Sequence, residues 1–537
     1  MKLNKISVIA IASTLLVGCV DLDTEPMGST VTENQKLATL DENPERAEAG
    51  VNGITTMFSI YMNGNPGYEN HNDFGYPSVM LFTDSRGTDL VSEDIGYNWF
   101  SAGLDFTDRN YKAFATENIW NTLYNQIYTA NLVANSVDSL SADPTMQFYA
   151  AQAYAIRAFD YFNLAQLYQF TYKGNEDKPC VPLILNWNSD QIASEGCARA
   201  TVQQVYDQIM LDLNVAVSLL ESAEANNFKR ADKRYVNLAV AKGLRARVEL
   251  VMNNWDAAYA DAMDVINSGE AKLNGIDECK KPTFSDSSEQ NWLWGIIIAE
   301  TDRVVTSGIV NWPSHMGSLN YGYASVGAWR MISKKLYNSI PSTDVRKGWW
   351  LNGNKVSSNL SKEQQAYVTS EAKCPAYTQV KFAPYKDEIY TSTNANDIPL
   401  MRIEEMYLIA AEAMCMGANG SDPVSAINFL ASQFIVPCRD KAFAPSVASQ
   451  EDAMNIIWQQ RRIELWGEGI SWFDIMRLKK GVDRRGTGFE PDLVFNIDAS
   501  DPILIYQIPE REIEGNPMLS EENNNANCET PVPVPDE

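Results

Sequence analysis

Two carboxylates on one predicted helix have the spacing that acid–base chemistry would require. Glu464 and Glu468 are four residues apart, so a helix over residues 450–467 would place both side chains on one face. A glycosidase uses two carboxyl groups about 5–9.5 Å apart. The neighbouring cations Arg461 and Arg477 would keep both groups ionised, whereas a general acid must hold a proton. We therefore expect a structural ion network and no catalytic residue.

Histidine and cysteine patterns give no support for a metal or cofactor site. His71 and His315 are the only histidines among 537 residues, and both fall in loop-like segments where either could donate a hydrogen bond to a ligand. The Cys-x-x-Cys and Cys/His spacings of zinc sites are absent. The Asn70–Asp73 cluster lacks the spaced acidic loop of an EF-hand. The sequence predicts no metal, no cofactor and little room for Ser-His-Asp chemistry.

The overall charge excludes one class of partner. The chain has 43 Lys and Arg against 69 Asp and Glu, a formal net charge of −26, and 10% of its residues are aromatic. Nucleic-acid binding through phosphates needs a concentrated basic surface, so no nucleic-acid partner is expected. The aromatic content is that of a folded globular protein.

The elements that must position these side chains are helices. Apolar residues with a period of about 3.6 predict repeat helices over about 117–268 and 400–480. Ala246, Ala258 and Ala262 would let two helices cross closely, as in a tetratricopeptide pair. The segments at about 279–338 and 349–399 lack helical periodicity, so we expect them to be loop-rich insertions. The expected fold is mainly α, with tetratricopeptide-like repeats and long irregular loop insertions.

The first 32 residues indicate export and anchoring. Lys2 and Lys5 precede an apolar run that is too short to span a bilayer and ends in Leu-Val-Gly before Cys19. This pattern resembles a lipobox, so we expect residues 1–18 to be a lipoprotein signal peptide and Cys19 to carry the lipid (with palmitate among its acyl chains). An ordinary signal peptide with an incidental cysteine is the alternative. Residues 19–32 are polar and predict a flexible tether.

The seven other cysteines have irregular spacing. We expect no more than two disulfide bridges, with Cys180–Cys197 the best candidate because it would close a short loop.

Three C-terminal motifs and one upstream motif point together to one family. They are Arg402-Ile-Glu-Glu-Met-Tyr-Leu-Ile-Ala-Ala-Glu-Ala413, the run Arg461–Arg477, the closing Ile508–Leu519 and Ala151–Ala158. With the lipobox, this ordered set resembles the SusD/RagB family of outer-membrane lipoproteins. One departure is Ser471, where the family commonly has Arg. The signature positions, expected to be scaffold, are Arg402, Glu405, Arg461, Glu464, Glu468, Asp474 and Arg477.

The resemblance implies a function through partnership. Members of the family bind a nutrient, mostly an oligosaccharide, and deliver it to a TonB-dependent (SusC-like) transporter without catalysis of their own. The expected location is the outer membrane, held by the lipid anchor and facing outside, with residues 33–537 forming a single unit.

Aromatic residues in two loop regions are the candidates for ligand contact. Carbohydrate recognition combines flat aromatic faces for sugar rings with amide and guanidinium groups for hydroxyls. The family places its stacking aromatics in loops at comparable positions, so location alone selects Arg86, Tyr97, Asn98, Trp99, Trp312, Tyr321 and Tyr323. Packing within the loops or contact with the transporter are the alternatives for each.

Other functions stay open from the sequence. The chain could be a peptide-binding member of the family, a surface glycoside hydrolase that uses Glu464, or a scaffold that binds no small ligand.

Overall fold

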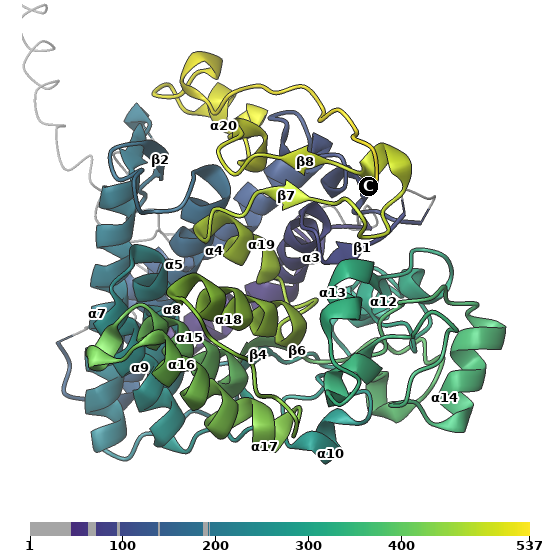
Figure 1. The fold of residues 1–537 in the computed structure, drawn as a ribbon. Coiled ribbons are helices and arrows are strands. Elements are labelled where there is room, and N and C mark those ends of the chain that lie inside the picture. Colours follow the sequence, from purple (N-terminus) through teal and green to yellow (C-terminus); the bar gives the residue numbers. More distant parts are fainter. Residues whose placement is uncertain (1–44, 63–70, 94–96, 138–139, 186–191, 193) are drawn as a thin grey trace, which may run out of the picture.

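The computed structural model describes residues 45–62, 71–93, 97–137, 140–185, 192 and 194–537 (Figure 1). The predicted leader, Cys19 and the tether lie outside the described residues.

Long helices packed side by side form the left half of Figure 1. Helix α5 packs between α4 and α7, and α9 packs between α8 and α15. Ala246, Ala258 and Ala262 are fully buried between α8 and α9, where a larger side chain would force the helices apart. The prediction of a mainly helical, tetratricopeptide-like fold is confirmed. The long helices are α2 (Glu45–Thr56), α3 (Tyr76–Arg86), α4 (Phe114–Ser136), α5 (Pro144–Tyr168), α7 (Val202–Ala225), α8 (Leu238–Met252), α9 (Trp255–Ser268), α15 (Ile403–Cys415), α16 (Pro423–Leu430) and α18 (Gln450–Glu464).

Local sequence signals set several helix ends. The Thr201 side chain accepts from the Gln204 backbone N–H and Gln204 caps Thr201 in return, which begins α7. Gly269 ends α9 in the left-handed conformation, at φ 77°. Helix α18 ends at Glu464 and not at residue 467, because the chain then turns through Gly467 and Gly469, both with positive φ. Glu464 and Glu468 therefore do not share one helix.

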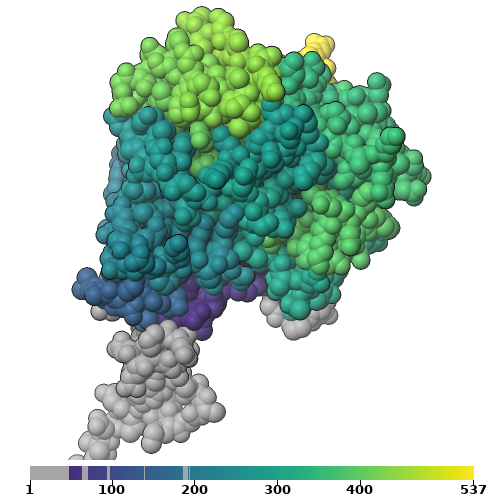
Figure 2. Space-filling model, turned by 90° about the horizontal axis from the view of Figure 1, so that it is seen from below, coloured from purple at the N-terminus to yellow at the C-terminus, as the bar shows by residue number. Residues whose placement is uncertain are grey.

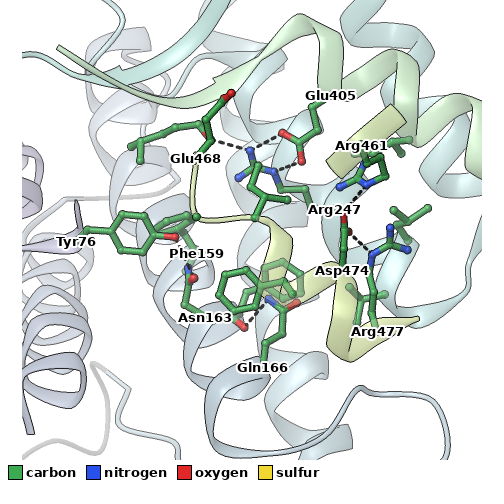
Figure 3. A pocket seen from close by; sticks show the side chains of 18 residues that line it. Tyr76, Phe159, Asn163, Gln166, Arg247, Glu405, Arg461, Glu468, Asp474 and Arg477 are labelled. Carbon is green, nitrogen blue, oxygen red and sulfur yellow. Dashed lines mark hydrogen bonds and ion pairs between the residues drawn. The ribbon is translucent and has the colours of Figure 1, made fainter. Parts of the chain in front are cut away.

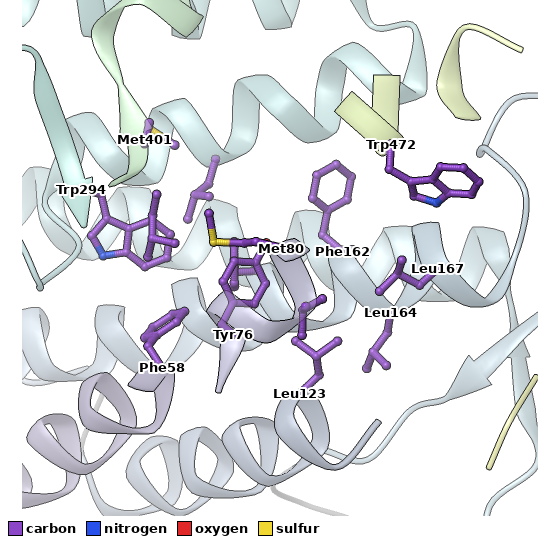
Figure 4. Packing of buried hydrophobic residues seen from close by; sticks show 14 of the residues in the cluster. Phe58, Tyr76, Met80, Leu123, Phe162, Leu164, Leu167, Trp294, Met401 and Trp472 are labelled. Carbon is purple, nitrogen blue, oxygen red and sulfur yellow. The ribbon is translucent and has the colours of Figure 1, made fainter. Parts of the chain in front are cut away.

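Helix α3 is buried along its whole length, Tyr76 to Arg86, beneath the other helices. A helix buried on all sides has no polar stripe, so it carries no amphipathic period for sequence analysis to detect. Aromatic side chains fill the core beside it (Figure 4). The Trp294 ring meets Phe58 and Phe159 edge to face, with centroids 5.4 and 5.3 Å apart.

Among the described residues, the strands form only two-stranded sheets. β4 (Trp292–Ile296) pairs antiparallel with β6 (Ile398–Arg402), and β6 leads directly into α15. The other pairs are β1 (Leu90–Val91) with β5 (Met331–Ile332), β2 (Pro179–Pro182) with β3 (Arg199–Thr201), and β7 (Val482–Asp483) with β8 (Asn496–Ile497).

Residues 279–399 lie largely at the lower right of Figure 1, and their green surface borders the teal part of the chain in the view from below (Figure 2). A small core of its own, including Leu319, Leu351 and Val380, orders this segment without long helices. Its helices are short: α10 (Ile276–Cys279), α11 (Arg303–Thr306), α12 (Trp312–Met316), α13 (Lys334–Ser339) and α14 (Lys362–Ala366). The remaining short helices are α17 (Val436–Cys438), α19 (Ser471–Arg477) and α20 (Glu510–Gly515).

The predicted Cys180–Cys197 bridge is wrong. Every cysteine of the described residues is a free thiol. Cys180 is fully buried beside α5 and α7, and burial raises the pKa of its thiol to about 12. Cys197 is half-buried, with its sulfur against the carbonyl oxygen of Leu183. In the part of the chain that the structure describes, no helix has both the length and the apolarity needed to cross a membrane.

Candidate functional site

Glu464 lies at the centre of a buried ion network. Arg439 Nε is 2.8 Å and Arg346 Nη1 3.2 Å from its Oε2, while Arg402 Nη1 is 3.1 Å from its Oε1. Burial alone would raise the pKa of Glu464, but the three guanidinium groups outweigh it and hold that pKa below its ordinary value. A carboxylate in this state cannot act as a general acid near neutral pH.

Glu468 joins the same network from the turn after α18. Its carboxylate accepts from Arg402 at 2.8 Å and from Lys381 at 2.6 Å. Burial opposes its ionisation, yet Arg402 and Lys381 keep its pKa below the ordinary value. Both carboxylates of the predicted pair are therefore bound by cations in the interior.

Four further ion pairs connect the C-terminal helices to one another and to α8. Asp474 accepts from Arg461 at 2.7 Å and from Arg477 at 2.8 Å, and Arg477 also binds Glu412 on α15. Glu405 pairs with Arg247 of α8 at 2.6 Å. Although Arg402 and Glu405 belong to one sequence motif, Arg402 pairs with Glu404, Glu464 and Glu468 instead.

A cavity of about 60 Å³ lies among these helices (Figure 3). Its polar side is formed by the paired Arg247, Arg461 and Arg477, and its apolar side by Phe159, Phe162 and Phe473. Small-molecule sites usually measure about 300–1,000 Å³. The cavity therefore holds a few water molecules at most, and Glu464 does not line it.

Four exposed aromatic side chains gather on the loop surface. We call this set the aromatic face: Tyr97 (57% exposed), Trp99 (41%), Tyr321 (36%) and Tyr390 (56%). Tyr390 contacts Tyr321 edge to face, with ring centroids 5.1 Å apart. Exposed large aromatic side chains close together are unusual on a protein surface and mark a contact site.

Tyr323 connects the two halves of the aromatic face from below. Its ring is 96% covered, and its centroid lies 6.3 Å from that of Tyr97. Burial, with smaller contributions from the phenols of Tyr321 and Tyr97, raises the pKa of Tyr323 to about 12, although the indole of Trp99 acts to lower it. Tyr97, Trp99 and Tyr321 therefore all lie near this one buried residue.

Backbone hydrogen bonds fix the second half of the aromatic face. The N–H of Tyr321 donates to the carbonyl of Thr391 at 2.9 Å, and the N–H of Tyr390 donates to that of Leu319 at 2.8 Å. Tyr390 has φ 63°, the left-handed region that a bulky residue rarely adopts. The loop thus turns this tyrosine outward beside Tyr321 at a conformational cost.

Four members of the predicted ligand set are buried, which corrects their expected place on the surface: Tyr323, described above, and Arg86, Asn98 and Trp312. Arg86 binds Asp108 at 2.6 Å and the carbonyls of Ile503 and Leu504. Asn98 accepts from Arg330 at 3.0 Å, and Trp312 packs edge to face on Phe382. Each supports the loops from within and has no surface to offer a ligand.

Both histidines lie behind the aromatic face. His71 stacks on Trp99, and His315, predicted in a loop, is fully buried in α12 against Tyr323. No group of three or more His, Cys, Asp or Glu side chains arranged to hold a metal occurs in the described part of the chain.

The motifs seen in the sequence lie within segments that match two family models. The SusD family model matches residues 321–525, and a second model, described as starch-binding and associating with the outer membrane, matches residues 79–247. The chain belongs to the SusD family.

Whole-chain relatives agree with this membership. SusD-like protein P2 of Formosa agariphila is 27% identical over 97% of this chain and 99% of its own length. A SusD-like carbohydrate binding protein from Bacteroides vulgatus superposes with a TM-score of 0.71 and 22% identity, over 89% of this chain and 97% of that one. Surface glycan-binding protein A from Bacteroides thetaiotaomicron superposes with a TM-score of 0.59 and 18% identity, over 89% of this chain and 99% of that one.

Within this SusD-family chain, sequence reasoning missed two members of the site. Tyr390 stands alone in a Thr- and Asn-rich stretch, and its partner Tyr321 is distant in the chain. The one available signal was that both lie in the predicted loop-rich insertions. His71 was considered only as a hydrogen-bond donor, although its role in the structure includes stacking.

Proposed function

We propose that this protein binds a glycan on the aromatic face and passes it to a transporter of the outer membrane. The observation that carries the proposal is the gathering of Tyr97, Trp99, Tyr321 and Tyr390, from loops far apart in the chain, on one exposed surface. Such rings cover the apolar faces of sugars, and the three phenol hydroxyls can donate to or accept from sugar hydroxyls.

The names of the structural neighbours support this ligand class. One is described as carbohydrate binding, and another, the surface glycan-binding protein A, is in complex with laminarihexaose. The present chain covers nearly the full length of both. A binding role without catalysis also agrees with Glu464 and Glu468, whose carboxylates are bound by cations in the interior.

Affinity electrophoresis against immobilised polysaccharides tests the proposal. The purified protein should be retarded in a gel containing at least one of laminarin, starch, xylan or mannan, and not in a plain gel. The Trp99→Ala/Tyr321→Ala double variant should migrate as in the plain gel. Equal migration of the wild type in every gel contradicts glycan binding and favours the peptide-binding or scaffold alternatives. Release of sugars by the purified wild type would contradict binding without catalysis and favour the hydrolase alternative.

The lipid anchor and the transporter belong to the same proposal. The Leu-Val-Gly-Cys sequence at residues 16–19 and the outer-membrane association in the description of one matching family model support surface anchoring. Cys19→Ala should move the protein from the membrane fraction to the soluble fraction, and retention in the membrane would refute the anchor. Deletion of the protein should reduce uptake of its glycan into the cell, and unchanged uptake would refute delivery.

A further inference from the structure

The indole ring of Trp99 is held from several directions by neighbouring side chains. His71 stacks on one face, with centroids 4.2 Å apart and the planes 12° from parallel. The Asn72 side-chain amide donates to the Trp99 carbonyl oxygen at 2.9 Å. The indole of Trp99 also interacts with the side chain of Tyr323, whose hydroxyl is hydrogen-bonded to His71 Nδ1.

Tyr323 and His71 are both uncharged near pH 7. A protonated phenol can donate to the unprotonated nitrogen of a neutral imidazole, so the Tyr323 hydroxyl can donate to His71 Nδ1. Burial raises the pKa of Tyr323 to about 12 and lowers that of His71, which keeps the phenol protonated and the imidazole neutral near pH 7. His71 thus contacts Trp99 through a ring stack and Tyr323 through a hydrogen bond.

His71 is itself held from behind by the second histidine. His315 Nε2 lies 2.8 Å from the carbonyl oxygen of His71, to which it donates. The His315 ring is stacked between Tyr323 and Phe74, with centroids 4.4 and 5.5 Å away. The only two histidines of the sequence therefore meet behind one exposed tryptophan.

We propose that His71 is a positioning residue for the glycan site, which fixes the orientation of Trp99 through its own ring and through the Tyr323 hydroxyl. The inference rests on the proposed function of the aromatic face. Because His71 covers one face of the indole, the exposed part of Trp99 is its opposite face and edge. Trp99 consequently offers one side to a sugar ring and cannot be sandwiched between two.

A double-mutant cycle tests the coupling of His71 to Tyr323. His71→Phe keeps a stacking ring but loses the acceptor, and Tyr323→Phe keeps the ring but loses the hydroxyl. Each should weaken binding of the polysaccharide that most retards the wild type, by about three- to tenfold, because each removes buried hydrogen bonding. In the Tyr323→Phe background, His71→Phe should have no further effect, since the shared bond is already gone. Independent, multiplying losses, or unchanged affinities in both single variants, would overturn the proposal.

A second measurement works without any ligand. Fluorotryptophan labelling gives one fluorine NMR line per tryptophan, and Trp99→Phe identifies the line of Trp99. In His71→Phe and Tyr323→Phe that line should move and broaden, while the lines of buried Trp292 and Trp349 and the melting temperature stay nearly unchanged. An unaltered Trp99 line in both variants overturns the positioning role. If the wild type binds no glycan, the proposed function fails while this measurement still decides whether His71 orients Trp99.

Discussion

The ion network around Glu464 and the aromatic face are built on opposite physical principles. In the ion network, charged groups are withdrawn from water and each carboxylate is matched by guanidinium or ammonium groups. On the aromatic face, Tyr97, Trp99, Tyr321 and Tyr390 leave large apolar surfaces in contact with water. The charged groups of the ion network bind one another, whereas the aromatic face retains exposed surface that a partner can cover.

This contrast separates the family-like sequence motifs of the chain from its binding chemistry. The charged residues that first suggest acid–base catalysis hold α15, α18 and α19 together. The residues available to a ligand lie in loops and share no motif. We expect changes in the ion network to affect folding, and changes on the aromatic face to affect binding.

The largest effect is expected from Glu464→Gln. The substitution leaves Arg346, Arg402 and Arg439 clustered in the interior without their shared carboxylate, so the free energy of unfolding should fall by about 3–5 kcal/mol. Chemical denaturation checks the stability, and glycan affinity of the folded fraction should be unchanged.

Glu451→Gln is the matched control, because Glu451 is exposed at the start of the same helix. This substitution should lower the free energy of unfolding by no more than about 1 kcal/mol. Equal stability of the two variants would contradict the role given to the ion network.

Trp99→Ala should have the largest effect on binding. Truncation of a central aromatic contact commonly costs about 2 kcal/mol or more, so affinity should fall at least about tenfold with a small change in melting temperature. Calorimetric titration measures the affinity. Tyr128→Ala removes a similarly exposed aromatic from α4, outside the aromatic face, and should bind as the wild type does. Equal loss in both variants would mean that the effect is not local.

Tyr390→Ala tests the member of the face that the sequence did not reveal. Tyr390 stands at the edge of the face beside Tyr321, so we expect a loss of about three- to tenfold, smaller than for Trp99. The same titration measures it. Wild-type affinity in this variant would restrict the site to the half around Trp99.

The smallest expected effect is a pH dependence of binding. Burial lowers the pKa of His71 below its usual 6.5, so the folded site favours the neutral ring. The contribution of His71 is therefore complete above about pH 6.5 and is lost as the pH falls through the lowered pKa. Protonation removes the acceptor for the Tyr323 hydroxyl. Glycan affinity measured from pH 7.5 to 5.5 should decline slightly for the wild type and stay constant for His71→Phe. An equal decline in both proteins would mean that a group other than His71 causes it.

Periodic and capping signals made much of the helical body predictable. Helix α9 ends at Ser268, where the first predicted helical region ends, and Thr201 and Gly269 act at helix ends because their local chemistry is sufficient. Helix α3 escaped prediction because burial on every side removes the polar stripe.

The site was less predictable because exposure in a loop depends on distant partners. Tyr97, Trp99 and Tyr321 are exposed, whereas Arg86 and Trp312, chosen by the same reasoning, are buried by Asp108 and Phe382. Residue type indicates that an aromatic or an arginine can bind a sugar. Long-range packing decides which of them reaches the surface.

A crystal structure of the protein with an oligosaccharide of the polysaccharide that it binds would test the central claim most directly. The account predicts one sugar ring on the exposed face of Trp99 and further units beside Tyr321 and Tyr390, with the ion network around Glu464 unchanged. A sugar bound elsewhere, with Trp99 and Tyr321 uncovered, would contradict the account.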